Sequence, residues 1–378
     1  MLRFLTAGES HGPCLTAIVE GLPAGLAVDV EVINRELKRR QGGYGRSERM
    51  VIEQDRAEIL AGVIAGKTTG APVALRIENK DWPNWRDRWA AGDLPRLGVP
   101  RPGHADYAGM IKYGLDDARP VLERASARET AARVAVGALA KQLLAAFDIA
   151  VGSYVAEIGT VVATIPNLLP EELWKLAEAS NVRCPDEETT ERMRTAIDAA
   201  RQAGDSLGGV FIVVATGVPI GLGSHVQWDR RLDTRLAAVV MSIPAIKGVE
   251  IGPAFENARR PGTQVHDELY PEEATEVATT NGKGGVTRRT NRAGGIEGGM
   301  SNGAPVVVRA AMKPIPTTVT PLHSVDLATG KVAATQYQRS DVCAVPAASV
   351  VGEAMVAWVL TEALLEKLGG DSLAEMAR

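Results

Sequence analysis

The segment 281–317 contains eight glycines between residues 282 and 303, and it continues into an apolar run that predicts a strand. Glycine at this density costs backbone entropy on folding, so it favours places where the backbone passes very close to another group. Arg288, Arg289 and Arg292 lie among these glycines, and guanidinium groups are typical of anion binding. Taken alone, the segment fits a backbone wall against an anionic ligand, a flexible exposed loop, or an Arg/Gly segment that binds RNA.

Composition narrows these alternatives. The chain has 378 residues, of which 45% are hydrophobic and 4% aromatic, and a formal net charge of −4. An acidic balance disfavours a bulk nucleic-acid binder, and scarce aromatics disfavour a base-stacking surface. Three cysteines without CxxC spacing predict neither a disulfide framework nor a zinc site. We find no signal peptide and no apolar run near the roughly 18 residues that span a bilayer, so we expect a cytoplasmic protein that binds no membrane.

Predicted strands occur in adjacent runs separated by long helices, which favours an α+β fold with antiparallel sheets packed with long helices, a β-α-β sandwich. No change in composition marks a linker, so we expect residues 1–378 to form one large domain. Residues 81–98 are irregular in sequence and predict either a long covering loop or an oligomer contact. The predicted strands are 4–6, 15–19, 72–77, 149–165, 210–215 and 306–308, and the predicted helices are 30–41, 124–147, 170–178, 187–203, 229–241 and 347–368.

Two histidines lie in glycine-containing turns. The segment GESHG at 8–12 predicts a tight turn between two strands, with His11 beside Ser10. His104 directly follows the Pro-Gly turn at 102–103. Histidine is the usual proton-transfer group at neutral pH, so we expect the two to work together. The alternative is that both are structural.

Arginines gather at loop junctions, which in an acidic chain predicts a small polyanionic ligand. Ser126 is expected at the start of the helix 124–147, where the helix dipole and free N–H groups favour a phosphate or carboxylate. The alternative is that these arginines are solvated surface groups. The arginines of these junctions are Arg39, Arg40, Arg46, Arg49, Arg101, Arg124, Arg128 and Arg339.

Several familiar motifs are absent or match only in letters. There is no GxGxxG after a strand, no HExxH and no acidic spacing typical of a hard metal. The segment 61–68 resembles a P-loop, but Ala61 stands where the first glycine belongs. GESHG matches the letters GxSxG, but a nucleophile elbow requires a strand-to-helix turn. What remains predicts acid/base chemistry on a substrate with phosphate and carboxylates, with a flat phosphorylated cofactor as a further component.

Seven segments together closely resemble the chorismate synthase family, in the family's order and over nearly the whole chain. They are GESHG at 8–12, RPGHAD at 101–106, RASARET at 124–130, KGVEIG at 247–252, NRAGGIEGGMSNG at 291–303, KPIPT at 313–317 and RSDVCAVP at 339–346.

This resemblance implies a 1,4-anti elimination of phosphate from 5-enolpyruvylshikimate-3-phosphate to give chorismate, the last step of the shikimate pathway. The family needs reduced FMN (FMNH2) although there is no net redox change, and it is usually a homotetramer. Some members reduce their flavin with NADPH; this chain has no obvious extra segment for NADPH, so an external source of reduced flavin is expected. The alternatives are an RNA-binding protein or another flavin enzyme, such as a flavin reductase.

The resemblance also implies roles for individual residues. His11 is similar to the histidine that protonates or hydrogen-bonds the reduced flavin, and His104 to the acid for the leaving phosphate. Thr317 and Asp341 fall where the family has a proton relay, and the glycine stretch is expected to face the flavin ring. Substrate contacts are implied for Ser10, Arg40, Arg46, Ser126, Arg128 and Arg339. Cofactor contacts are implied for Arg101, Arg124, Ala125, Ser126, Ala245, Gly298, Lys313, Pro314, Ile315, Pro316, Thr317 and Arg339, and no metal is expected.

Overall fold

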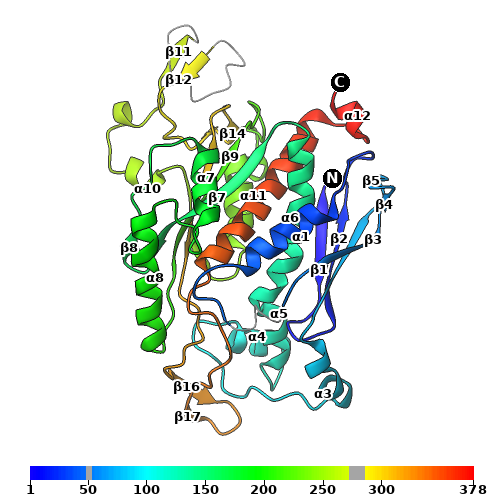
Figure 1. Ribbon diagram of the computed structural model, residues 1–378, viewed down its shortest axis with the longest axis vertical. Helices are drawn as coiled ribbons and strands as arrows, with labels where there is room; N and C mark the ends of the chain where they lie inside the picture. Colours follow the sequence, from blue (N-terminus) through cyan, green and yellow to red (C-terminus); the bar gives the residue numbers. More distant parts are fainter. Residues whose placement is uncertain (48–52, 272–285) are drawn as a thin grey trace.

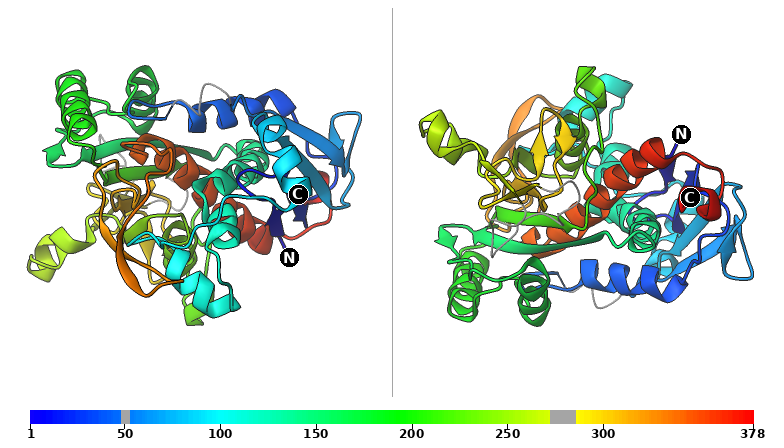
Figure 2. Two further views of the ribbon diagram at one scale, coloured as in Figure 1. Left: turned by 90° about the horizontal axis from the view of Figure 1, so that it is seen from below. Right: turned by 90° about the horizontal axis from the view of Figure 1, so that it is seen from above.

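A computed structural model describes residues 1–47, 53–271 and 286–378 (Figure 1). Residues 281–285 of the glycine stretch and Arg49 lie outside the described residues. Two antiparallel sheets are separated by a layer of helices, as Figure 2 shows with α6 and α11 between the N-terminal sheet and the second sheet. The predicted α+β fold with a β-α-β sandwich is therefore confirmed.

The first sheet has the strand order β1-β2-β6-β3. Alternate residues of its strands face the helices, as a two-residue repeat requires. Leu15, Val19 and Leu75 are buried on this inner face, whereas Leu5 and Ile18 are exposed on the outer one. Its strands are β1 (Arg3–Ala7), β2 (Cys14–Glu20), β3 (Ala57–Ala61) and β6 (Val73–Glu78).

The second sheet has the order β10-β15-β9-β7-β8, and all its described neighbours pair antiparallel. Helix α7 covers part of its outer face, where Trp174 lies against Gly152: a Cβ there would be 2.4 Å from the indole ring. The strands are β7 (Ala150–Ile158), β8 (Val161–Val162), β9 (Gly209–Thr216), β10 (Ile246–Ile251) and β15 (Val306–Met312); the outer helices are α7 (Pro170–Ala179) and α8 (Glu187–Gln202).

The middle layer consists of α1 (Val30–Gln41), α6 (Thr130–Ala145), α9 (Leu232–Met241) and α11 (Val345–Leu368). The side chain of Asp29 caps α1, and Gly42 ends it, both as predicted. Helix α11 is long and apolar enough to cross a membrane, but 89% of its most apolar 18-residue stretch is buried inside the molecule. It is therefore a core helix, and one hydrophobic cluster joins it to both sheets.

The remaining elements are short and lie mostly in the connections. They are β4 (Val63–Ile64), β5 (Lys67–Thr68), η1 (Trp82–Asn84), α3 (Arg86–Ala91), α4 (Asp106–Tyr113), α5 (Arg119–Ala125), η2 (Ala127–Glu129), η3 (Trp228–Arg230), α10 (Ala254–Asn257), η4 (Gly262–Gln264), β11 (Leu269–Pro271), β12 (Val286–Arg288), β13 (Ile296–Glu297), β14 (Met300–Ser301), β16 (His323–Asp326), β17 (Lys331–Ala334) and α12 (Leu373–Met376).

Two local predictions were wrong. The single helix expected over 124–147 is interrupted at Ser126, which is extended and whose hydroxyl accepts a hydrogen bond from the backbone N–H of Arg128. Serine competes in this way with helical bonding, so α5 ends there and α6 begins only at Thr130. The loop expected over 81–98 contains η1 and α3, and α3 ends at the left-handed Gly92.

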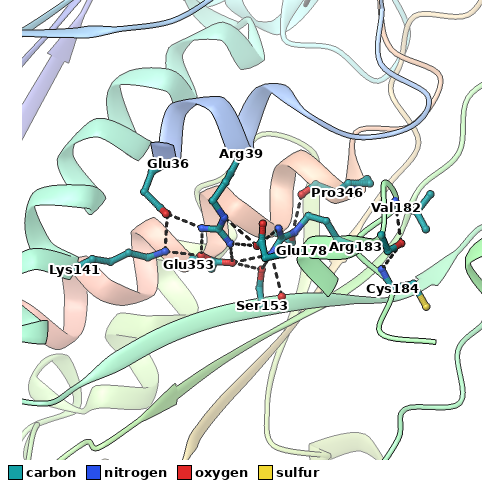
Figure 3. A network of polar contacts seen from close by, with 12 residues as sticks. Glu36, Arg39, Lys141, Ser153, Glu178, Val182, Arg183, Cys184, Pro346 and Glu353 are labelled. Carbon is teal, nitrogen blue, oxygen red and sulfur yellow. Dashed lines mark hydrogen bonds and ion pairs between the residues drawn. The ribbon is translucent and has the colours of Figure 1, made fainter. Parts of the chain in front are cut away.

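A buried ion cluster fastens the middle layer to the second sheet (Figure 3). Glu353 of α11 is fully buried and binds Arg39 of α1 at 2.7 Å, Lys141 of α6 at 2.5 Å and Arg183 at 3.0 Å. The hydroxyl of Ser153, on β7, donates to the same carboxylate at 2.6 Å. Burial alone would raise the pKa of Glu353, but the charges of the three cations outweigh it, so the net pKa lies well below its usual range.

We predict that Glu353→Gln lowers the free energy of unfolding by roughly 3–5 kcal/mol, because it leaves buried cations without their shared anion. Urea denaturation measures this, with Glu191→Gln in an exposed pair as a control expected to change stability by less than about 0.5 kcal/mol.

The same effect has a defined pH dependence. Because the folded pKa of Glu353 is depressed, its ionisation stabilises the fold above the unfolded pKa of about 4.3 and ceases to do so as the pH falls toward the folded value. The difference in the free energy of unfolding between the wild type and Glu353→Gln should therefore narrow below about pH 4.3. A pH-independent difference would contradict this account.

Candidate active site

A cavity of about 680 Å³ opens beside the first turns of α11 and the end of α1. Its wall combines the β1–β2 turn with loops that precede α4, follow α5, precede β10 and follow β15. It contains most of the site residues predicted from the sequence: Ser10, His11, Arg40, Arg46, Arg101, His104, Ala125, Ser126, Arg128, Ala245, Lys313, Ile315, Pro316, Thr317, Arg339 and Asp341.

Three predicted cofactor contacts lie outside the lining of this cavity. The Arg124 guanidinium instead binds the hydroxyl and carbonyl oxygens of Thr6 at 2.7 and 3.0 Å. Gly298 occupies the exposed turn between β13 and β14, and Pro314 is absent from the wall although its neighbours on both sides line it. Cofactor contacts by these three residues remain predictions.

The described glycines of 286–303 also lie away from the cavity. Gly294 and Gly295 permit close approach, but to the protein's own backbone. A Cβ on Gly294 would be 2.4 Å from the nitrogen of Gly252, and one on Gly295 would be 2.5 Å from the carbonyl oxygen of Pro305. The prediction was close approach to a ligand; the flavin-facing role of this stretch stays a prediction.

His11 is held by Glu123 from the last turn of α5. The Glu123 carboxylate accepts hydrogen bonds from the His11 backbone N–H at 2.9 Å and lies 2.9 Å from His11 Nδ1. The Trp85 ring packs on the imidazole with centroids 4.1 Å apart. Burial alone would raise the pKa of Glu123; the hydrogen bonds and charge of His11, followed by Arg119, lower it overall.

His104 has a similar partner in Asp106, which begins α4. The distance from His104 Nδ1 to Asp106 is 2.5 Å, and Arg101 binds the same carboxylate through Nε at 2.8 Å and Nη2 at 3.0 Å. Burial would raise the pKa of Asp106, but His104 and Arg101 hold it well below its usual range. Arg101 also donates to the Thr317 hydroxyl at 3.2 Å, so this group joins two walls of the cavity.

Arg40 and Arg128 form the most buried cationic part of the wall. Arg128 donates through Nη1 to Glu53 at 3.0 Å and to Asp55 at 2.6 Å, whereas Arg40 Nη1 lies 3.6 Å from Asp55. Burial, opposed by Asp55 and reinforced by the charges of Arg128 and Arg46, lowers the pKa of Arg40 to about 10.

Three buried nitrogen atoms of this pair make no hydrogen bond within the described part of the chain: Nη1 of Arg40, and Nε and Nη2 of Arg128. Unused buried donors are costly. A ligand that carries several anionic oxygens could satisfy them, which is the donor chemistry expected of a phosphate or carboxylate site.

Asp341 and Thr317 line the cavity but have separate partners. Asp341 binds Arg46 Nη1 at 2.8 Å and accepts from the Ser47 backbone N–H at 2.7 Å. Arg339 is half-exposed and lies 3.7 Å from Asp81. Among the described contacts Asp341 and Thr317 are not bonded to each other, and their action as a proton relay stays a prediction.

The loop before β10 presents strained backbone to the cavity. Ala245 has a φ of +69°, a backbone conformation that residues other than glycine rarely adopt. Its carbonyl oxygen accepts a hydrogen bond from the Lys313 backbone N–H at 2.9 Å. Such conformations are concentrated at ligand sites. Burial, followed by the charge of Lys247, lowers the pKa of Lys313.

A family model described as chorismate synthase matches residues 2–365 of this chain. The chain belongs to the chorismate synthase family. It is therefore a phosphate-eliminating lyase, as the sequence motifs predicted.

Individual relatives agree with this assignment over the whole chain. The chain is 55% identical to chorismate synthase of Chlorobaculum tepidum, covering 100% of this chain and 96% of the relative. It is 56% identical to that of Geobacter sulfurreducens, covering 100% and 97%. A crystal structure of chorismate synthase superimposes with a TM-score of 0.79 at 48% identity, covering 100% of this chain and 95% of that one.

Sequence reasoning missed the carboxylates that hold the cationic groups of this chorismate synthase site. Asp106 lies within the RPGHAD motif and Glu123 directly precedes RASARET, so both were near residues that had been singled out. Glu53 and Asp55 lay in no motif. Their partners are distant in the chain, and pairing of that kind has no local signal. Among the residues that the structure describes, no cluster could hold a metal ion.

We predict that replacing the two buried arginines changes stability by different amounts. Arg40→Met should change the free energy of unfolding by less than about 1 kcal/mol, because it removes a desolvated cation whose donors are only partly used. Arg128→Met should cost roughly 3–5 kcal/mol, because Glu53 and Asp55 lose the guanidinium that they share. Urea denaturation of both variants measures the contrast; equal losses would contradict it.

Proposed function

We propose that this cavity binds 5-enolpyruvylshikimate-3-phosphate together with reduced FMN and eliminates phosphate from C3 of the substrate to give chorismate. The observation that carries this proposal is the set of unused buried donors on Arg40 and Arg128, beside two histidines with carboxylate partners. A substrate with one phosphate and two carboxylates offers the oxygens that these donors need.

The cavity also has room for a cofactor. Its volume of about 680 Å³ lies within the range of small-molecule sites. Ile243, Met312, Ile315 and Pro316 give part of the wall an apolar surface on which a planar ring can rest, with Lys313 beside them. Reduced FMN, when bound, supplies an electron-rich ring that assists the departure of phosphate.

The chain's own residues then have distinct tasks. Arg40, Arg46 and Arg128 hold the anionic groups. His104, whose Nδ1 is bound to Asp106, uses Nε2 to give a proton to the departing phosphate. Asp341 forms an ion pair with Arg46. An anion that binds Arg46 would compete with Asp341 for this guanidinium. Once released, Asp341 is available, together with Thr317, for removal of the C6 proton of the substrate.

The decisive experiment is anaerobic. The protein, dithionite-reduced FMN and 5-enolpyruvylshikimate-3-phosphate should release inorganic phosphate and form chorismate, and omission of the reductant should abolish both. Equal phosphate release with oxidised FMN would overturn the proposed cofactor requirement. No release under reducing conditions would overturn the proposed activity.

We propose that reduced flavin comes from an external source and that the protein works in the cytoplasm as a homotetramer. Support for assembly comes from apolar side chains on the outer face of the first sheet, where Leu5 is 74% and Leu60 54% exposed. Light scattering during gel filtration tests the tetramer. Activity with NADPH and oxidised FMN alone would contradict the need for an external reductase.

We predict that His11→Ala and His104→Ala each lower turnover by roughly 10²–10⁴-fold, the usual contribution of a general acid or base. Far-ultraviolet circular dichroism should show an unchanged fold. His266→Ala, outside the cavity lining, serves as the control and should keep wild-type turnover. If either cavity variant turns over at a near-normal rate, its histidine has no proton-transfer role.

A further inference from the structure

We propose that Glu123 is a positioning residue for the reaction: it binds His11 through Nδ1, fixes the tautomer of the imidazole and thereby leaves Nε2 as the nitrogen that serves the cavity. This inference rests on the proposed function of His11. It assigns a role to a residue that belongs to none of the groups expected to touch substrate or cofactor.

The contacts of Glu123 determine where the imidazole proton lies. Its two oxygens receive the His11 backbone N–H at 2.9 Å and an Arg119 guanidinium N–H at 3.3 Å, and both lie near His11 Nδ1, at 2.9 and 3.1 Å. Two of these neighbours are fixed donors, and an ionised carboxylate only accepts. A neutral imidazole can satisfy it only with the hydrogen on Nδ1, and a carboxylate partner of this kind also sets the ring's orientation.

The ionised state of Glu123 is itself supported. Its side chain is only 3% exposed, but His11 and Arg119 together lower its pKa despite burial. Arg119 is fixed in turn, because its Nε donates to the Pro95 carbonyl at 3.0 Å and its backbone N–H donates to Asp117 at 2.9 Å. The carboxylate therefore stays charged and in place at neutral pH.

The same residue also fixes the turn that carries His11. The backbone N–H of Ser10 donates to the Glu123 carbonyl at 2.9 Å, so the last turn of α5 binds both main chain and side chain of this turn. Trp85 covers one face of the imidazole, and its indole N–H donates to Asp81 at 3.1 Å. Because Glu123 binds the Nδ1 edge of the imidazole and Trp85 packs on one face, the ring can present only Nε2 to the cavity.

Within the described residues, His11 Nε2 makes no hydrogen bond, although the side chain lines the cavity and is 14% exposed. This nitrogen is therefore available to a bound ligand. A purely structural carboxylate would need only to neutralise Arg119 and to accept the hydrogen bond from the His11 backbone N–H. The choice of tautomer is the property that a positioning role adds, and it can be measured without turnover.

Glu123→Gln separates these roles, because an amide has nearly the same shape but offers both a donor and an acceptor. Either neutral tautomer can then pair with it. Nitrogen-15 NMR of histidine-labelled protein, without ligands and above the pH of histidine titration, should show His11 as a single Nδ1–H tautomer in the wild type and as a mixture in the variant. The His11 signals are assigned by their loss in His11→Ala.

Glu123→Asp keeps an acceptor-only partner, so it should retain the Nδ1–H tautomer; it also preserves the test if Glu123→Gln does not fold. A wild-type protein with the hydrogen on Nε2, or a Glu123→Gln protein with an unchanged tautomer, would overturn the proposal.

Kinetics provide the second readout. Glu123→Gln should lower turnover roughly 10–100-fold, as the loss of a carboxylate behind a metal-bound histidine does, with KM changed less than about threefold. In the His11→Ala background the same substitution should lower turnover by less than about twofold, because a residue that acts through His11 has nothing left to position. Independent, multiplicative losses would overturn the proposal.

The matched control is Glu129→Gln, which removes another buried carboxylate with an arginine four residues later but no histidine contact. It should leave the tautomer and the turnover at wild-type values. If His11→Ala itself keeps full turnover, the proposed function of His11 fails, while the NMR measurement still decides whether Glu123 sets the tautomer.

Discussion

The pairing of buried carboxylates with cations is the constraint on which this molecule depends. Glu353, in the middle of α11, joins that helix to α1, α6 and the second sheet (Figure 3). Cations that cluster around one anion in a water-poor interior can be satisfied only in one arrangement, because any displaced member becomes an unpaired buried charge. The helices that border the cavity are therefore fixed in relation to one another before any ligand binds.

The same kind of pairing recurs at the cavity, where buried carboxylates hold the histidines and arginines that line it. Glu123 supports His11, Asp106 supports His104 and Arg101, and Asp55 supports Arg128. In each pair the carboxylate side chain is less exposed to solvent than the side chain that it holds. Arg128 keeps two buried nitrogens without a hydrogen bond within the described residues, which suits a polyanionic substrate.

Much of the fold could be predicted because its signals are local. Asp29 and Gly42 mark the ends of α1 through capping chemistry, and the apolar run predicted as a strand at 15–19 lies within β2. The interruption at Ser126 was missed because a single hydroxyl bond outweighed a long helical pattern. The pairing of His11 with Glu123, 112 residues apart, depends on tertiary contact and has no local pattern.

The position of α1 has a consequence for how this chain can vary. Arg39 points into the ion cluster around Glu353, and the next residue, Arg40, points to the cavity. Successive helical residues are about 100° apart around the axis. A single-residue insertion in α1 before Arg39 would therefore turn Arg39 toward the ligand side and Lys38 toward the ion cluster. A deletion there would turn Arg40 toward the ion cluster and leave Gln41 on the ligand side. Among homologues, length changes near this helix should be confined to its flanking loops, while substitutions on its outer surface accumulate freely.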